Sequence, residues 1–168
     1  LAGYPTYAGC SRELPKKWQT EGPVVRTLRH QLVTVPGKTH TVQFAFGALG
    51  TNTHWGTPRN PWDSEFHRAP GGSSAGAGVS LWEGSALLAL GSDTAGSVRM
   101  PASFTGTVGI KTSKGRWSTA GIVPLSTTLD TAGTLTRTVS DAALAFAVID
   151  PLVSESTDTF NHHLGTAS

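Results

Sequence analysis

The stretch from residue 71 to residue 112 constrains the fold of this chain more than any other. It reads GGSSAGAGVSLWEGSALLALGSDTAGSVRMPASFTGTVGIKT and sets glycines and serines around two short apolar runs. Glycine lets the backbone turn tightly, and the serines place hydroxyl groups at those turns. We therefore expect a fold built around two tight turns that carry the chemistry.

The second of these turns joins a strand to a helix. The apolar run at residues 87–90 lies between two glycines and is too short for a helix, so it predicts a short buried strand. A small-residue loop follows at 91–97, and residues 98–102 can open a helix. Such a junction presents successive backbone N–H groups to one point, which suits an oxyanion or another anion. Ser97 lies at that point.

The first turn, at residues 71–76, leads into a segment at 77–88 that can be helical. Its hydroxyl groups reach Ser97 only through the fold, because Ser73 lies 24 residues earlier. Serine at its free pKa is a poor nucleophile and needs a neighbouring group to take its proton. The pair is therefore more informative than either serine alone.

Both turns resemble those of the amidase signature family, whose members hydrolyse carboxamides and related C–N bonds with a Ser–Ser–Lys triad. The runs GGSSAGAG at 71–78 and LGSDTAGSVRMPASFTGTVGIK at 90–111 carry the likeness. It extends from residue 2 to residue 149, which corresponds to the N-terminal and central part of a family domain. The resemblance implies an α/β layered domain with a mixed sheet, of which residues 1–168 are an incomplete portion.

The resemblance also assigns roles, position by position. The nucleophile falls on Ser97, and the bridging serine, which follows a cis peptide bond in the family, falls on Ser73. The two hydroxyl groups are then expected within hydrogen-bond reach of each other. The oxyanion hole of backbone N–H groups falls on Thr94, Ala95, Gly96 and Ser97. Residues that hold these loops by hydrogen bonds in relatives match Ser74, Asp93 and Arg99.

The lysine of the family triad has no match in this chain. In the family it lies on a strand before the region that matches Leu1. By motif, Lys38 belongs to a GKT turn, Lys111 to the strand expected after the helix, and Lys16 and Lys17 to a polar loop. We therefore expect the general base and the C-terminal part of the domain to lie outside residues 1–168, and this chain alone to be inactive.

Composition narrows the class further. A chain of 168 residues, 38% hydrophobic, suffices for one packed domain. Its net charge of +2 is scattered and predicts no nucleic-acid surface. The single cysteine, Cys10, excludes an internal disulfide and fits a reducing compartment, and no apolar run is long enough to span a bilayer. A cytoplasmic protein without a nucleic-acid or membrane partner is expected.

Metal and cofactor chemistry is not expected either. The six histidines lack the spacing of metal ligands. No lysine follows the glycines at the distance that a phosphate-binding loop requires. The five tryptophans read as packing residues, with Trp55 the one whose loop can face the site.

Outside the central stretch, local patterns predict two helices. The first spans residues 21–32, with Pro23 in its first turn and a narrow apolar stripe. The second spans 142–149, with Ser140 or Thr138 as its N-cap. A short strand is expected at 32–35, an undecided helical or extended segment at 41–46, a long loop at 47–62, turns and short-strand material at 115–128, and a polar, weakly patterned tail beyond residue 151.

A rival mechanism would use a different serine. Residues 72–76, GSSAG, fit the nucleophile elbow of Ser-His-Asp hydrolases, with Ser74 as nucleophile. Such an elbow follows an apolar strand, whereas residues 63–70 are polar and contain a proline. The elbow is therefore disfavoured.

The function expected from this sequence is hydrolysis of a carboxamide C–N bond through an acyl-enzyme on Ser97, with Ser73 as proton relay. The substrate would be a small-molecule amide. Two alternatives stay open: a glutaminase-type subunit that passes ammonia to a partner in a transamidating complex, and a non-catalytic fragment. A homo-oligomer or a partner subunit is compatible with each.

Overall fold

The computed structural model describes residues 1–150 of the chain. Its central sheet has three strands in the order β1-β3-β2, formed by Leu88–Asp93, Thr131–Thr136 and Val108–Lys111 respectively. Four α-helices surround it: α1 (Pro23–His30), α2 (Ala75–Glu83), α3 (Arg99–Thr105) and α4 (Val139–Ile149). Two short 3-10 helices, η1 (Lys16–Gln19) and η2 (Gln43–Ala45), lie in the N-terminal part.

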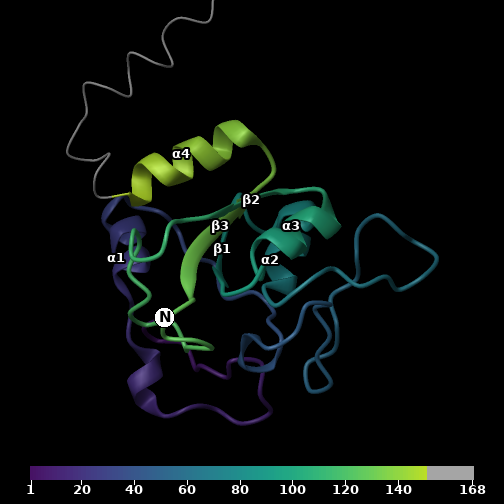
Figure 1. Cartoon of the computed structure of the whole chain (residues 1–168), viewed down its shortest axis with the longest axis horizontal. Coiled ribbons are helices and arrows are strands. Elements are labelled where there is room, and N and C mark those ends of the chain that lie inside the picture. Colours follow the sequence, from purple (N-terminus) through teal and green to yellow (C-terminus); the bar gives the residue numbers. More distant parts are fainter. Residues whose placement is uncertain (151–168) are drawn as a thin grey trace, which may run out of the picture.

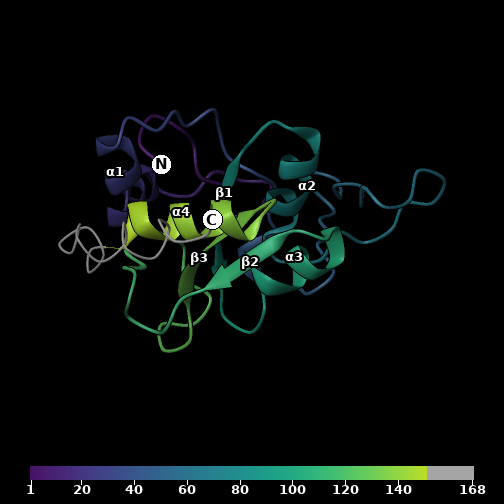
Figure 2. The same ribbon diagram turned by 90° about the horizontal axis from the view of Figure 1, so that it is seen from above.

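The helices form a layer on each face of the sheet, with α2 and α3 on one side and α1 on the other (Figure 1). Figure 2 shows the same arrangement from above, with the sheet between the helical layers. Successive residues of a strand point to opposite faces, and β1 follows this rule: Ala89 packs with α2 and α3, whereas Leu88 and Leu90 pack with α1 and α4. The predicted α/β layered class is confirmed.

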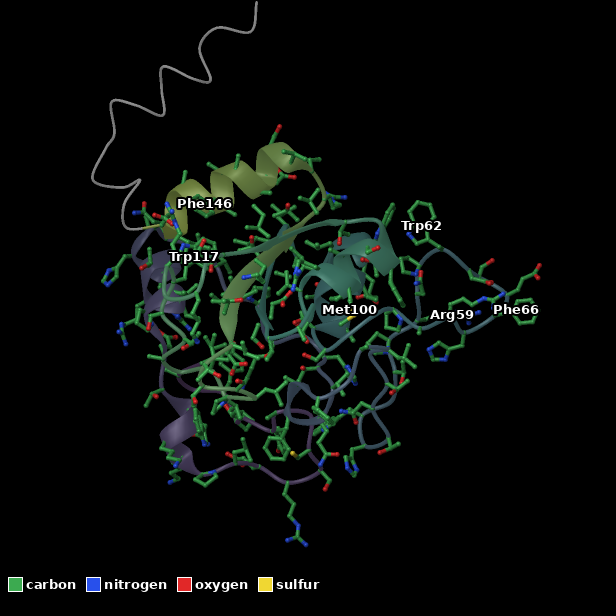
Figure 3. All side chains as sticks on the ribbon, in the orientation of Figure 1. Arg59, Trp62, Phe66, Met100, Trp117 and Phe146 are labelled. Carbon is green, nitrogen blue, oxygen red and sulfur yellow. The ribbon has the colours of Figure 1, made fainter. Side chains whose placement is uncertain are left out.

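The two apolar cores are small and well enclosed. One contains Leu81, Val98 and Leu135 together with the alanines of α2, β1 and α3. The other is built around Trp117, whose ring lies 5.4 Å from that of Phe146 on α4 (Figure 3). Together they cover both faces of β1 and β3.

The direction of the strands differs from the expectation. Strand β3 pairs antiparallel with both β1 and β2, so within residues 1–150 no neighbouring strands are parallel and the expected mixed sheet is not found in this part. The reason is topological. Strands β1 and β2 run the same way and are joined by a crossover through α3, but β3 lies between them and opposes both.

Most of the predicted helices are found, with shifted ends. Helix α1 begins with a proline in its first turn, as predicted, and α4 is capped by Thr138, whose side chain accepts a hydrogen bond from the N–H of Asp141. Helix α2 begins at the serine turn itself and ends at Gly84, which has the left-handed conformation, φ 75°. Glycine adopts that conformation without the steric cost of a Cβ atom.

The strand predictions were less accurate. Strand β1 starts one residue later than expected and runs through Gly91 and Ser92 to Asp93, and Leu87 is 75% exposed. The prediction of a strand at 32–35 is wrong. No strand forms there, because Leu32 has φ 59° and is 91% exposed. The undecided segment at 41–46 contains η2, and residues 47–62 form the predicted loop.

The loop at 57–70 projects away from the body of the domain and carries Trp62 and Phe66 (Figure 3). Its base is anchored by Asn60, whose side-chain amide donates to the carbonyl oxygens of Ala69 and Phe104. No helix within residues 1–150 is long and apolar enough to cross a membrane. The predicted polar tail, with its His162-His163 pair, lies outside the described residues.

Candidate active site

Ser97 lies in the short loop between the end of β1 and the start of α3. The loop is folded around the carboxylate of Asp93, which is fully buried. Asp93 accepts hydrogen bonds from the backbone N–H groups of Gly96 (2.7 Å), Val98 (3.1 Å) and Arg99 (3.3 Å). The carboxylate of Asp93 therefore binds backbone N–H groups on both sides of Ser97.

Arg99 completes this arrangement with its side chain. Its Nε and Nη2 atoms lie 3.1 Å and 3.0 Å from the two carboxylate oxygens of Asp93. Burial by itself raises the pKa of Asp93, but the hydrogen bonds from Arg99 and the backbone outweigh it, and the net pKa is lowered. The carboxylate is therefore charged near neutral pH, and the loop keeps its shape.

The four residues expected to form the oxyanion hole differ in whether their N–H groups have a partner. Thr94, Ala95, Gly96 and Ser97 do form one loop, and the N–H of Gly96 donates to the Asp93 carboxylate. Within the described residues, the N–H groups of Thr94, Ala95 and Ser97 donate to no other protein group. Three of the four N–H groups therefore have no partner within the described residues, whereas that of Gly96 has one.

Ser73 lies in the turn before α2, and the peptide bond between Gly72 and Ser73 is cis, as predicted. The turn is held by its main chain. The carbonyl oxygen of Ser73 accepts from the N–H of Val42 (3.0 Å) and the hydroxyl group of Thr41 (3.1 Å), while the N–H of Gly72 donates to the carbonyl oxygen of Ala48 (2.7 Å). The segment at 41–48 thus holds the Ser73 turn in place through these three hydrogen bonds.

The two serine turns touch, but not in the way that was expected. The N–H of Ser74 donates to the carbonyl oxygen of Ser97 at 3.1 Å. The two hydroxyl groups were expected within hydrogen-bond reach of each other, but the Ser73 hydroxyl group is buried and has no hydrogen-bond partner among residues 1–150. The main chain, rather than the two side chains, joins the turns.

Ser74 contacts both the Ser97 loop and β1. It is the N-cap residue of α2, and its hydroxyl group points back to β1, 3.5 Å from the carbonyl oxygen of Ser92. No strand precedes it within residues 57–72, so the strand-turn-helix geometry of a nucleophile elbow is absent there. Trp55, whose loop can face the site, donates its indole N–H to the carbonyl oxygen of Cys10 (2.8 Å) and packs against Tyr7.

Sequence reasoning missed one buried acid beside the loop. Asp130, the residue before β3, accepts a hydrogen bond from the hydroxyl group of Thr94 at 2.5 Å. The two residues lie 36 positions apart along the chain, and no local motif marks the contact. Residues 1–150 contain no group of three or more His, Cys, Asp or Glu side chains placed to hold a metal ion.

Known proteins are similar to this chain in sequence. The family model described as Amidase matches residues 1–163. The chain is 68% identical over 150 residues to 2-amino-5-chloromuconic acid deaminase of Comamonas testosteroni, covering 89% of this chain and 32% of that protein. It is 43% identical over 151 residues to a glutamyl-tRNA(Gln) amidotransferase subunit of Desulforudis audaxviator (strain MP104C), covering 89% and 30%.

A solved structure has the same fold. The crystal structure of an amidase superposes with a TM-score of 0.82 at 42% identity, over 89% of this chain and 34% of that one. The chain thus spans about a third of the length of the relatives it matches. Since the family model covers nearly all of its residues and the fold agrees, the chain belongs to the amidase family.

Proposed function

We propose that the protein to which this chain belongs hydrolyses C–N bonds through an acyl-enzyme formed on Ser97. One observation supports this most directly: the turn of Ser73 and the loop of Ser97 are joined by the hydrogen bond from Ser74, in a chain of the amidase family. The loop also leaves three backbone N–H groups without a partner among the described residues. An acyl-transfer site needs a nucleophile, here the Ser97 hydroxyl group, and N–H groups that stabilise the oxyanion.

The reaction has two halves. The Ser97 hydroxyl oxygen attacks the substrate carbonyl carbon, and its proton passes through Ser73 to a basic group, while the N–H groups of Thr94, Ala95 and Ser97 stabilise the oxyanion. The C–N bond then breaks, and the amine leaves with the relayed proton. Water attacks the acyl-enzyme, returns a proton to Ser97 and releases the carboxylic acid. A single oxyanion donor is worth about 100- to 1,000-fold in rate.

The basic group is proposed to be a lysine from outside residues 1–168. Within the described residues no lysine bonds to the Ser73 hydroxyl group. Lys38 is held by the carbonyl oxygen of Pro5, Lys111 by that of Thr112, and Lys114 by those of Thr127 and Asp130. The buried Ser73 hydroxyl group is where such a lysine would bind.

The relatives suggest which substrates to test. The name of the Comamonas testosteroni protein gives 2-amino-5-chloromuconic acid as the compound that it deaminates, and simple carboxamides represent the family reaction. Both reactions release ammonia, but only a carboxamide has a carbonyl carbon at the C–N bond that breaks, so the carboxamides test the acyl-enzyme step. A glutaminase-type subunit stays the alternative, because the chain also resembles one subunit of an amidotransferase. That function would require a partner protein for full activity.

The test uses the longest natural protein that contains these residues, purified and assayed for ammonia release. The substrates are 2-amino-5-chloromuconic acid, glutamine and a panel of simple carboxamides. Ser97→Ala is expected to lose several orders of magnitude in kcat, whereas Ser74→Ala, the matched serine of the adjacent turn, should retain measurable activity. Glutamine turnover that rises strongly when a partner protein is added would favour the alternative.

Covalent labelling separates the two serines. A fluorophosphonate probe should modify Ser97, and mass spectrometry of the digested protein will identify the labelled peptide. Modification at Ser74 instead would make Ser74 the nucleophile and restore the elbow mechanism.

A further inference from the structure

Asp130 lies where β1 ends and β3 begins, directly beside the Ser97 loop. In the sheet register Asp93 pairs with Thr131, so the residues next to this pair also face each other. Two side-chain hydrogen bonds cross at this point. The Thr131 hydroxyl group donates to the carbonyl oxygen of Asp93 (2.8 Å), and the Thr94 hydroxyl group donates to the carboxylate of Asp130 (2.5 Å).

The carboxylate of Asp130 is held firmly from its other side. It is buried and accepts hydrogen bonds from the backbone N–H groups of Leu125 (2.9 Å) and Ser126 (3.0 Å). The N–H of Asp130 donates to the carbonyl oxygen of Ser126, and its own carbonyl oxygen accepts from Lys114 at 2.8 Å. These contacts fix Asp130 within the turn at 125–130, so the hydroxyl group of Thr94 meets an acceptor that is already in place.

Thr94 in turn is the first residue of the loop that carries the three unpaired N–H groups. The far side of the loop is fixed by Asp93 through the main chain of Gly96, Val98 and Arg99. The near side is tied to the start of β3 by the hydrogen bond from the Thr94 side chain to Asp130. Two acids, one at the end of β1 and one just before β3, therefore hold the two sides of one loop.

We propose that Asp130 is a positioning residue for the oxyanion loop, acting through the Thr94 hydroxyl group. This rests on the proposed function, in which the N–H groups of Thr94, Ala95 and Ser97 stabilise the oxyanion. Donors of this kind act only if they are held in place before the transition state forms. A displacement of about 1 Å in such a site can lower the rate about 100-fold.

The decisive variant is Thr94→Val, which removes the hydroxyl group at nearly constant shape and leaves the 125–130 turn intact. In the full-length protein it should lower kcat about 10- to 100-fold with KM changed less than about threefold. Thr94→Ser, which restores a hydroxyl group, should recover most of the lost kcat. Asp130→Ala also removes the acceptor of the Leu125 and Ser126 N–H groups, so it should lower kcat at least as much. The double variant should be no worse than Asp130→Ala, because both contain the loss of the hydrogen bond between Thr94 and Asp130.

The control is a second Thr–Asp pair, far from the loop. The Thr138 hydroxyl group donates to the carboxylate of Asp141 at 2.7 Å at the start of α4. Thr138→Val and Asp141→Ala should lower the melting temperature without lowering kcat. A kcat that is unchanged in Thr94→Val, or losses that add fully in the double variant, would overturn the role of Asp130.

The outcome for Ser97→Ala keeps the two proposals separate. If Ser97→Ala abolishes activity and Thr94→Val does not impair it, only the positioning role fails. If Ser97→Ala stays active, the proposed function fails, and with it the basis for this inference.

Discussion

The main-chain N–H of Ser74 donates a hydrogen bond to the carbonyl oxygen of Ser97 at 3.1 Å. This contact joins two turns that come from different elements, one at the start of α2 and one at the end of β1. A main-chain contact does not depend on the protonation of either serine. The two turns therefore stay together whether or not the serine side chains are hydrogen-bonded to each other.

The 168-residue chain on its own should not hydrolyse amides. Its serines keep their positions, but no lysine within the described residues bonds to the Ser73 hydroxyl group, and a triad without one member typically loses several orders of magnitude in rate. Ammonia release from the isolated chain and from the longer natural protein, at equal concentration, measures this. Activity of the chain within about tenfold of the longer protein would mean that a lysine inside it serves as the base.

Gly76→Ala should destabilise the fold although alanine is the better helix former. A Cβ atom at residue 76 would lie 2.3 Å from the backbone nitrogen of His40, whose carbonyl oxygen also accepts the Gly76 N–H at 2.8 Å. The clash is with main chain, so overpacking of about 1–3 kcal/mol should exceed the gain of about 1 kcal/mol in helix propensity. The difference in unfolding free energy is measured by urea unfolding, with tryptophan fluorescence as the signal.

Gly37→Ala provides the matched control. A Cβ atom at residue 37 would meet no heavy atom within 4 Å, so the free energy of unfolding should change by less than about 0.5 kcal/mol. Equal destabilisation by both substitutions would show that the contact with His40 is not the cause.

Asp93 should make the stability depend on pH on the acid side. Its pKa in the folded protein is lowered, since the hydrogen bonds from Arg99 and the backbone outweigh burial. A carboxyl group with a lowered folded pKa adds stability that is complete above its unfolded pKa of about 3.9 and is lost as pH falls through the folded value. Asp93→Asn should therefore destabilise by about 2 kcal/mol at pH 7, with the difference from wild type narrowing below about pH 4.

Unfolding free energies at several values between about pH 7 and about pH 3 measure this dependence. Glu83→Gln, at the exposed end of α2, is the control and should change stability by less than about 0.5 kcal/mol at neutral pH. A constant difference between Asp93→Asn and wild type over the whole range would contradict the prediction.

Asp150→Ala should loosen the end of α4. The buried Asp150 carboxylate accepts from Arg116 Nε (2.5 Å) and from the indole N–H of Trp117 (3.0 Å). Its removal leaves the buried indole N–H without this acceptor, and a buried donor that loses its partner costs about 1–3 kcal/mol. Calorimetry should show a lower melting temperature, and Asp141→Ala, at the exposed start of the same helix, should lower it less. An equal shift for both would contradict this explanation.

The central stretch could be predicted because its chemistry is local. Glycine and serine in short runs specify tight turns, and periodic apolar residues specify α1 and α4, so the turns and helices were found at nearly the right residues. The strand at 32–35 was predicted wrongly from its apolar residues, because Leu32 instead adopts a positive φ in the turn that follows α1. Strand β1 was cut short in the prediction because Gly91 and Ser92 have weak strand preference.

Contacts between distant residues could not be predicted in this way. The commitment of the Gly96 N–H to Asp93 requires the folded loop, and the hydrogen bond from Thr94 to Asp130 requires β3 beside β1. Neither contact has a signature in residue spacing, since each depends on backbone geometry that arises only in the packed sheet.

The position of β3 between β1 and β2 has a consequence for synthesis of the protein on the ribosome. Residues 73–97, with both serines, emerge well before residues 131–136, which supply the strand that β1 pairs with and the threonine that binds the carbonyl oxygen of Asp93. A nascent chain that ends before residue 131 contains both candidate catalytic serines but lacks the strand that anchors their loop. The loop of Ser97 is therefore anchored only after both serines have been synthesised, by a strand that contributes neither of them.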